Sequence, residues 1–215
     1  LQIMGRDFGY MAEQGQWTYW GRRGRRSGLA YPALRGAIQL ANASTTIAAL
    51  EALADRLPVS MQDIRRGLIE VELPGRFQVL PGRPTVVLDV GHNPQAAGVL
   101  ADNLGDMAFY PETWAVFGML ADKDIAGVVE CVRGRVDRWC LATLPGPRGM
   151  TAEALARILA GHGILVEACC DSPADAYRAA RDRAGENDRI VAFGSFLTVA
   201  GVLHAIDDER KRRTT

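Results

Sequence analysis

Residues Thr85-Val86-Val87-Leu88-Asp89-Val90 form a nearly continuous apolar run, and Gly91-His92-Asn93-Pro94 follows directly. Continuous rather than alternating hydrophobicity predicts a strand that is covered on both faces, as in parallel sheets. Asn followed by Pro indicates a helix start, because Asn can cap the first turn and Pro suits its first position. The segment therefore predicts a strand, a short loop and a helix of a parallel α/β sheet.

The same rhythm continues to the end of the chain. Further apolar runs span residues 114–119, 138–143, 164–169 and 189–193, and helices are predicted to open near Asp124, Thr151, Ser172 and Ser195. Strands that alternate with helices in this way predict a doubly wound, mostly parallel, Rossmann-like sheet. We assign residues 73–215 to this domain.

Residues 1–72 show a different pattern. Aromatic residues and glycines dominate the first 35 residues, with turn signals between short runs, which predicts antiparallel β-hairpins. Two helices should follow, the second beginning at Ser60 with Asp63 three residues later. The first should carry one apolar face, formed by Ile47, Leu50, Leu53 and Leu57. A Pro-Gly break then follows Leu73, so we place the domain boundary there and predict a strand over residues 77–80.

The composition bounds the class of protein. The 215 residues include 25 Lys and Arg and 25 Asp and Glu, so the formal net charge is 25 − 25 = 0, and 48% are hydrophobic. This is typical of a globular chain rather than a disordered one or a basic nucleic-acid tail. No apolar run reaches the roughly 18 residues of a membrane span, and the four cysteines include no C-x-x-C pair. We expect a cytoplasmic monomer that binds neither membrane nor nucleic acid.

One window of the chain is locally basic, because residues 14–50 contain no Asp or Glu. Its arginines are Arg22, Arg23, Arg25, Arg26 and Arg35. Arginines interleaved with aromatic residues can bind phosphate or nucleic acid. A solvated hairpin tip is the alternative, and we prefer it because the whole chain is neutral.

The functional site should lie at one edge of the predicted sheet. In open α/β sheets, ligands bind beyond the carboxyl ends of the strands. Glycines with charged or hydroxyl residues follow four of the predicted strands, at residues 89–94, 118–124, 143–149 and 194–196. These loops are therefore the candidates for binding and chemistry.

Familiar phosphate loops and metal motifs do not occur in this sequence. No G-x-G-x-x-G follows the Thr85 strand, which argues against a dinucleotide-binding dehydrogenase. Gly118 and Lys123 match half of a Walker A loop, but Asp122 and Asp124 stand where that loop needs Gly and a hydroxyl. There is no G-x-S-x-G elbow. The three histidines are too widely separated to predict a zinc site.

Four segments together carry a resemblance to a known family. They are Leu73-Pro74-Gly75-Arg76-Phe77-Gln78, Asp89-Val90-Gly91-His92-Asn93-Pro94, Gly118-Met119-Leu120-Ala121-Asp122-Lys123-Asp124 and Phe193-Gly194-Ser195-Phe196. Over essentially its whole length, the chain resembles the bifunctional dihydrofolate synthase/folylpolyglutamate synthases of the Mur ligase superfamily. The resemblance implies an ATP-dependent carbon–nitrogen ligase that adds L-glutamate to dihydropteroate and to folates such as tetrahydrofolate. The reaction would pass through an acyl phosphate made from ATP, with Mg²⁺ as cofactor.

The resemblance also bears on the first residue, which is Leu1 rather than Met. Family members carry an N-terminal ATPase region whose P-loop, Mg²⁺ ligands and modified lysine lie upstream of the segments found here. We therefore expect residues 1–72 to be the last part of the central ATP-binding domain and residues 73–215 to be the complete C-terminal glutamate ligase domain. No complete catalytic set is expected in this segment, which should be inactive without its N-terminal ATPase region.

The resemblance implies a nucleotide-binding role for four residues. Arg76 matches the arginine that reaches the nucleotide phosphates, with a solvated linker arginine as the alternative. Asp89 matches an aspartate that contacts the nucleotide, although it could instead order its loop. Asn42 matches a nucleotide-binding asparagine, and an N-cap is the other interpretation. His92 either touches the nucleotide or orders its turn together with Asn93.

Two further residues are implied in binding glutamate. Lys123 would pair with a glutamate carboxylate, and its alternative is an ion pair with Asp122 or Asp124. Ser195 would hydrogen-bond a carboxylate or would cap a helix, and Arg148 is a weaker candidate at the same edge. Two other functions stay open: a Mur-type ligase for another acceptor, and a binding domain without catalysis.

Overall fold

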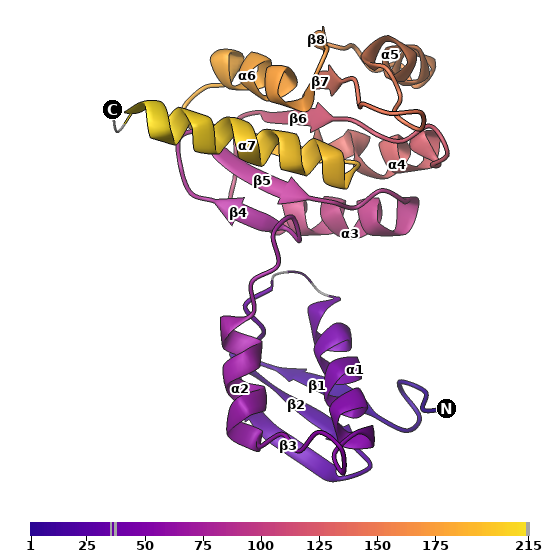
Figure 1. The fold of residues 1–215 in the computed structure, drawn as a ribbon, viewed down its shortest axis with the longest axis vertical. Helices are drawn as coiled ribbons and strands as arrows, with labels where there is room; N and C mark the ends of the chain where they lie inside the picture. Colours follow the sequence, from indigo (N-terminus) through magenta and orange to yellow (C-terminus); the bar gives the residue numbers. More distant parts are fainter. Residues whose placement is uncertain (35, 37, 214–215) are drawn as a thin grey trace. The chain divides into compact units, whose positions relative to one another are not determined.

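The computed structural model describes residues 1–34, 36 and 38–213, so Arg35 of the basic window lies outside the described residues. The chain forms two compact units, Leu1–Leu73 and Pro74–Thr215. Both are drawn in Figure 1, and each is described here by itself.

The first unit is a three-stranded antiparallel sheet with two helices, as the sequence predicts. Its strands are β1 (Gly9–Glu13), β2 (Gln16–Gly21) and β3 (Gly24–Leu29), in that order across the sheet, and its helices are α1 (Gln39–Ala52) and α2 (Met61–Glu70). Trp17, Tyr19 and Ile47 are almost fully buried in its core. Ser60 and Asp63 cap the start of α2 reciprocally, which confirms the predicted start of that helix.

The prediction of an apolar face on the first helix is wrong at the C-terminal end of that helix. Helix α1 ends at Ala52, and Leu53 and Leu57 are 45% and 51% exposed. Pro58 lacks the backbone N–H that a continuing helix would need. The leucine spacing therefore continues past the point where the helix can.

The described arginines of the basic window lie on the β2–β3 hairpin, and two of them are paired. The Arg26 guanidinium donates to Glu51 on α1 at 2.9 Å, and the Tyr19 hydroxyl donates to the same carboxylate at 3.0 Å. Burial and this carboxylate raise the pKa of Tyr19 well above its usual range. Arg23 lies 3.6 Å from the fully exposed Asp55. Arg26 thus ties the hairpin to α1.

The second unit is built on a six-stranded sheet with the order β4-β5-β9-β6-β7-β8. The strands are β4 (Gln78–Leu80), β5 (Thr85–Asp89), β6 (Thr113–Phe117), β7 (Arg138–Ala142), β8 (Ala168–Cys170) and β9 (Arg189–Phe193). All neighbours pair in parallel except β4, which runs antiparallel to β5. The arrowheads of β5, β6 and β7 accordingly point to the same side in Figure 1.

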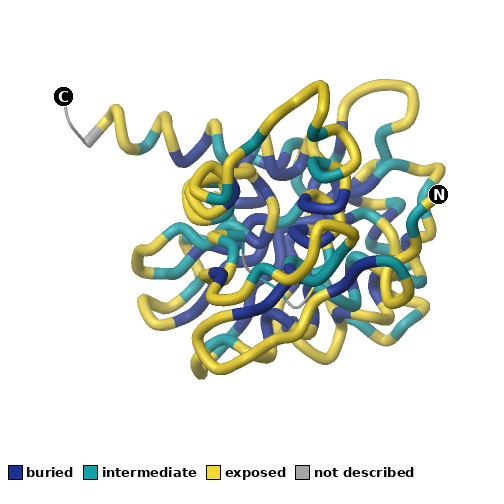
Figure 2. Tube along the Cα trace, turned by 90° about the horizontal axis from the view of Figure 1, so that it is seen from below, coloured by how far each residue is buried: buried dark blue, intermediate teal, exposed yellow. Residues whose placement is uncertain are grey.

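Helices cover both faces of this sheet. Helices α3 (Pro94–Gly105), α4 (Ile125–Val132) and α5 (Ala152–Gly161) pack on one face, and α6 (Pro173–Arg183) and α7 (Phe196–Arg213) on the other; a short 3₁₀ turn, η1 (Arg133–Arg135), follows α4. Phe117 contributes to the first core and Val116 to the second, because successive side chains of a strand point to opposite faces. The last turns of α7, beside the C-terminus in Figure 2, are mostly exposed. The doubly wound, mostly parallel fold is confirmed.

Local predictions in this unit hold with two corrections. Helices α3, α4, α5 and α6 begin at the predicted caps, which are Asn93, Asp124, Thr151 and Ser172. Strand β8 is shorter than predicted, because it lies at the sheet edge, where Leu165 is 89% exposed instead of covered. Phe77 does not belong to β4, since its φ of 42° is incompatible with an extended strand.

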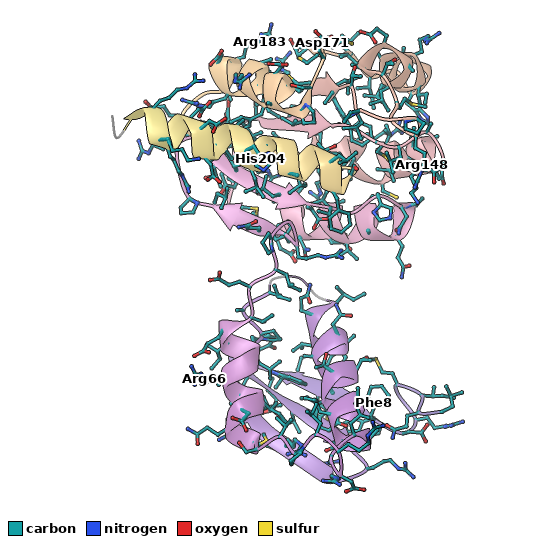
Figure 3. All side chains as sticks on the ribbon, in the orientation of Figure 1. Phe8, Arg66, Arg148, Asp171, Arg183 and His204 are labelled. Atoms are coloured by element: carbon teal, nitrogen blue, oxygen red, sulfur yellow. The ribbon has the colours of Figure 1, made fainter. Side chains whose placement is uncertain are left out.

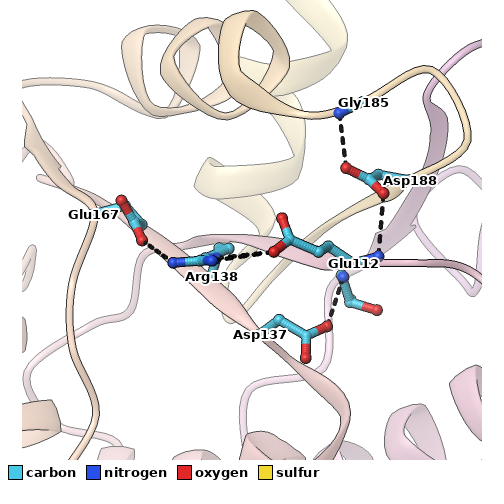
Figure 4. Close-up of polar contacts among 7 residues, drawn as sticks. Glu112, Asp137, Arg138, Glu167, Gly185 and Asp188 are labelled. Atoms are coloured by element: carbon cyan, nitrogen blue, oxygen red, sulfur yellow. Dashed lines mark hydrogen bonds and ion pairs between the residues drawn. The ribbon is translucent and has the colours of Figure 1, made fainter.

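At the amino ends of the parallel strands, charged residues form ion pairs and hydrogen bonds with one another and with the backbone (Figure 4). Arg138 at the start of β7 donates to Glu112 at 3.1 Å and to Glu167 at 2.8 Å. Asp188 before β9 accepts from the backbone N–H groups of Gly185 (2.7 Å) and Glu112 (3.1 Å). These side chains hold neighbouring loops together. In the described part of the chain, no helix is long and apolar enough to cross a membrane.

Candidate functional site

The carboxyl ends of β5, β9 and β6 meet through three glycines. The Gly194 N–H donates to the Gly91 carbonyl at 3.2 Å. Gly194 has a φ of 102°, and a Cβ built there would lie 2.7 Å from the Gly118 oxygen, far inside van der Waals contact. Glycine is required at this position for both its backbone conformation and its close approach. The loops after three strands are thus held at one small area.

Thr198 fixes the same area from α7, and the sequence reasoning missed it. Its buried hydroxyl donates to the Gly118 carbonyl at 2.8 Å, which ties the first turn of α7 to the end of β6. A polar residue among the apolar positions of that helix is the one local signal that could have indicated this bond.

Asp89 orders its own loop. Its carboxylate accepts from the Gly91 N–H at 2.7 Å and from the Phe77 N–H at 3.0 Å. Burial raises the pKa of Asp89, although these two hydrogen bonds and the nearby Arg76 charge oppose the rise. The loop-ordering interpretation is therefore correct. The nucleotide contact stays a prediction.

Arg76 lies next to this loop, on the segment that leads into β4. Its side chain is exposed, and its guanidinium carbon lies 5.9 Å from the centre of the Phe196 ring. The Arg76 charge acts on Asp89, so the two residues share one end of the unit. An exposed guanidinium at this position can pair with an anion.

His92 and Asn93 shape the turn after β5. The His92 Nδ1 lies 3.0 Å from the Val90 carbonyl oxygen, which can only accept a hydrogen bond, so Nδ1 is the donor in this contact. Asn93 accepts from the Ala96 N–H at 2.8 Å and caps α3. Both residues order the turn, as one of the two interpretations predicts for His92.

Lys123 belongs to a charged group that also contains Asp122 and Arg148. The Lys123 ammonium lies 3.6 Å from the Asp122 carboxylate, and Arg148 donates to both oxygens of that carboxylate at 3.1 and 3.0 Å. The ion pair that was the alternative for Lys123 is therefore present. Two cations share the Asp122 carboxylate, while the neighbouring Asp124 carboxylate accepts from the Gly127 N–H at 2.9 Å and caps α4.

This charged group sits where the loops after β6 and β7 join. The Ala121 N–H donates to the Arg148 carbonyl at 2.8 Å, and the Met150 N–H donates to the Met119 carbonyl at 3.2 Å. In Figure 3, Arg148 is labelled on the side toward which the strand arrowheads point. Arg148 thus lies at the same edge of the sheet as the glycine contacts.

Ser195 is 5% exposed and directly precedes α7. Its Oγ accepts from the Leu197 N–H at 3.2 Å, the hydrogen bond expected of an N-cap. The hydroxyl can still donate its proton. Ser195 therefore caps the helix, and its predicted contact with a glutamate carboxylate is untested.

Asn42 lies in the first unit and is not a cap. The N-cap of α1 is Ile38, and Asn42 is exposed within the helix, where its amide donates to the Gln39 side chain at 3.3 Å. The N-cap interpretation is wrong because the helix begins earlier than the apolar pattern suggests. Its nucleotide role stays a prediction.

The described residues at the carboxyl edge are better able to bind anions than metal ions. Within residues 1–34, 36 and 38–213, no group of three His, Cys, Asp or Glu side chains could hold a metal ion. Exposed cations at the carboxyl edge are Arg76 and Arg148, with Lys123 partly exposed. Phosphate and carboxylate groups are the ligands that such cations prefer.

Comparisons with known proteins agree with this picture. A family model described as "Mur ligase, glutamate ligase domain" matches residues 75–196. The dihydrofolate synthase/folylpolyglutamate synthase of Escherichia coli is 39% identical over 98% of this chain and 47% of its own length. The Haemophilus influenzae protein of the same name is 35% identical over 93% of this chain and 49% of its length. The chain thus spans about half the length of these curated relatives.

Solved structures match both units along the chain. Escherichia coli FolC in complex with ADP has a TM-score of 0.87 at 38% identity, over 98% of this chain and 49% of that one. A bifunctional folylpolyglutamate synthase/dihydrofolate synthase with Mn, AMPPNP and L-glutamate bound has a TM-score of 0.80 at 38% identity, over 95% and 47%. With its fold, its glycine-joined strand ends and the family model in agreement, this chain belongs to the Mur ligase family, and residues 75–196 match its glutamate ligase domain.

Proposed function

We propose that this chain is the glutamate-ligase part of an ATP-dependent carbon–nitrogen ligase that joins L-glutamate to dihydropteroate and to folates. The observation that carries the proposal is the set of cations at the carboxyl edge of the sheet: the exposed Arg76 near Asp89, and the partly exposed Lys123 with the exposed Arg148. The Escherichia coli relative, at 39% identity, carries the corresponding name, and one similar structure holds AMPPNP and L-glutamate.

The proposed reaction needs two steps because a carboxylate is a poor electrophile. The acceptor carboxylate first attacks the γ-phosphorus of ATP, which forms an acyl phosphate and releases ADP. The glutamate amine then attacks the acyl carbon and expels phosphate, and an amide remains after the amine loses a proton. Negative charge develops on the phosphoryl oxygens in the first step, where fixed cations stabilise it.

Each candidate residue has a proposed task in this scheme. Arg76 pairs with a nucleotide phosphate, and Asp89 and Asn42 contact the nucleotide. His92 orders the adjoining turn and contacts the nucleotide through its other ring nitrogen, Nε2. Lys123 pairs with a glutamate carboxylate, Arg148 supports the same charge, and Ser195 donates its hydroxyl proton to it.

Mg²⁺ belongs to the proposal only as a partner of ATP. The described residues include no group of three His, Cys, Asp or Glu side chains that could hold a metal ion, and in this proposal residues outside this segment supply the Mg²⁺ ligands. A monomer and a cytoplasmic location are part of the same proposal. Light scattering and cell fractionation test them.

The decisive test is an activity assay on the complete protein that contains this chain. We expect ADP and phosphate to form only when ATP, L-glutamate and an acceptor are all present, and mass spectrometry should show one added glutamate on dihydropteroate or tetrahydrofolate. Turnover with a different acceptor alone would favour another Mur-type ligase. ADP binding without turnover on any acceptor would favour a binding domain.

A further inference from the structure

Phe196 is an exposed aromatic residue at the start of α7, directly after Ser195. Its side chain is 58% exposed, whereas Val199 and Val202, further along the same helix, are 3% and 0% exposed. Burial of a Phe side chain normally stabilises a folded protein substantially. Because Phe196 is mostly exposed, it gains little of that stabilisation. Core packing therefore does not explain an aromatic ring at this position.

The ring instead contacts Arg76. The guanidinium carbon lies 5.9 Å from the ring centre, inside the roughly 6 Å range of a cation–π interaction. The two residues are 120 positions apart in the sequence (196 − 76), so the fold brings them together. In the described part of the chain, Arg76 has no carboxylate within ion-pair distance.

The backbone on both sides of Arg76 is already fixed. The Gly75 carbonyl accepts from the Val90 N–H at 2.8 Å, and the Phe77 N–H donates to Asp89 at 3.0 Å. Phe77 is 6% exposed and has a φ of 42°, a conformation that non-glycine residues rarely adopt. A Cβ on Gly75 would lie 2.8 Å from Val90, so this segment fits closely against the end of β5. Only the side chain of Arg76 remains to be positioned.

We propose that Phe196 is a positioning residue, whose ring holds the Arg76 guanidinium in place for an incoming nucleotide phosphate. The inference rests on the proposed function, in which Arg76 binds that phosphate. A free arginine side chain loses rotamer freedom when it binds an anion, and a side chain held beforehand loses less. Phe196 would therefore raise nucleotide affinity through Arg76, without a nucleotide contact of its own.

A double-mutant cycle on the complete protein tests the inference, with the dissociation constant of ADP as readout. We expect Phe196→Ala and Phe196→Leu to weaken ADP binding about two- to fivefold, the range of an exposed cation–π contact. Phe196→Tyr, which keeps the ring, should restore wild-type affinity. In an Arg76→Met background, Phe196→Ala should have no further effect. Phe109→Ala is the matched control, because Phe109 is 90% exposed in the loop before β6.

Two outcomes would overturn the inference. Equal loss of ADP affinity from Phe196→Ala with and without Arg76 would mean that the ring contacts the nucleotide directly. Unchanged ADP affinity of Phe196→Ala in the protein that keeps Arg76 would mean that the ring does not hold Arg76 ready for the nucleotide phosphate.

A second readout does not depend on nucleotide binding. Because the Arg76 charge lowers the pKa of Asp89, a guanidinium released from Phe196 should leave that pKa higher in Phe196→Ala, as measured by carbon NMR of the carboxyl group. If the wild-type protein fails to bind ADP while this pKa still rises, the proposed function fails and the Phe196–Arg76 contact stands. If the wild-type protein binds ADP and Phe196→Ala changes neither the ADP affinity nor the pKa of Asp89, the inference about Phe196 fails and the proposed function stands.

Discussion

The two ends of the parallel sheet in the second unit use similar charged residues in opposite ways. At the amino ends, Arg138 is held between two glutamates, and Asp188 accepts two backbone N–H groups. At the carboxyl ends, Lys123 and Arg148 share the single carboxylate of Asp122. These charges at the first end are satisfied within the protein, whereas at the second end two cations share one carboxylate. The way the charges are paired, rather than their number, distinguishes the two ends.

A cavity at the amino end of the sheet shows the same internal pairing of charges. A cavity of about 170 Å³ between the β4–β5 turn and helices α6 and α7 is lined by several arginines. Of these, Arg181 pairs with Glu209, and Arg83 lies 3.5 Å from Glu186. Arginines that are paired internally hold elements together.

The largest expected effect concerns the glycine contacts that join the carboxyl ends of β5, β9 and β6. Gly194→Ala should destabilise the protein by about 3 kcal/mol or more, because a Cβ would collide with the Gly118 oxygen in a backbone conformation that disfavours side chains. Chemical denaturation measures the loss. Gly134→Ala is the control, since a Cβ there meets nothing within 4 Å. Equal stability of the two variants would show that the strand ends are not held by this contact.

The second-largest effect tests whether the amino ends of the strands have a structural role that is independent of nucleotide binding. Asp188→Ala leaves two backbone N–H groups without their acceptor and should cost about 2–3 kcal/mol of stability. ADP affinity of the folded fraction should stay unchanged, because the amino end is structural. Asp182→Ala, an exposed neighbour, serves as the control. Reduced ADP affinity in folded Asp188→Ala would break the division between the two ends.

Glutamate recognition gives a third effect. Lys123→Ala in the complete protein should raise the KM for L-glutamate about tenfold to a hundredfold, the contribution of a hydrogen bond to a charged group, and leave the KM for ATP unchanged. Lys211→Ala, at the chain's only other lysine, should change neither constant. An unchanged KM for glutamate in Lys123→Ala would reduce Lys123 to the partner of Asp122.

Sequence reasoning succeeded where the signal is local and failed where the partners are distant. The caps Asn93, Asp124 and Ser172 were predictable because a cap and the helix it starts are adjacent in sequence. The Arg148–Asp122 pair spans 26 residues, and the Thr198 bond to Gly118 spans 80. Such pairs depend on the strand order, which no local pattern encodes. Asp89 shows the intermediate case, since its position was predictable and its two N–H partners were not.

The smallest expected effect is the pH dependence that Asp89 contributes. Burial raises the pKa of Asp89 above its ordinary value of 3.8 in the folded state, so its protonated form favours folding. Its contribution is therefore complete below pH 3.8 and is lost as the pH rises through the folded pKa. Stability measured by denaturation between pH 3.5 and about 7 should fall relative to Asp89→Asn, whose side chain does not titrate. A wild-type stability that rises relative to the variant over this range would mean that the hydrogen bonds from Gly91 and Phe77, with the Arg76 charge, outweigh burial. Asp89 would then resemble the fully satisfied Asp188, and the contrast between the two ends would rest on Arg76, Lys123 and Arg148 alone.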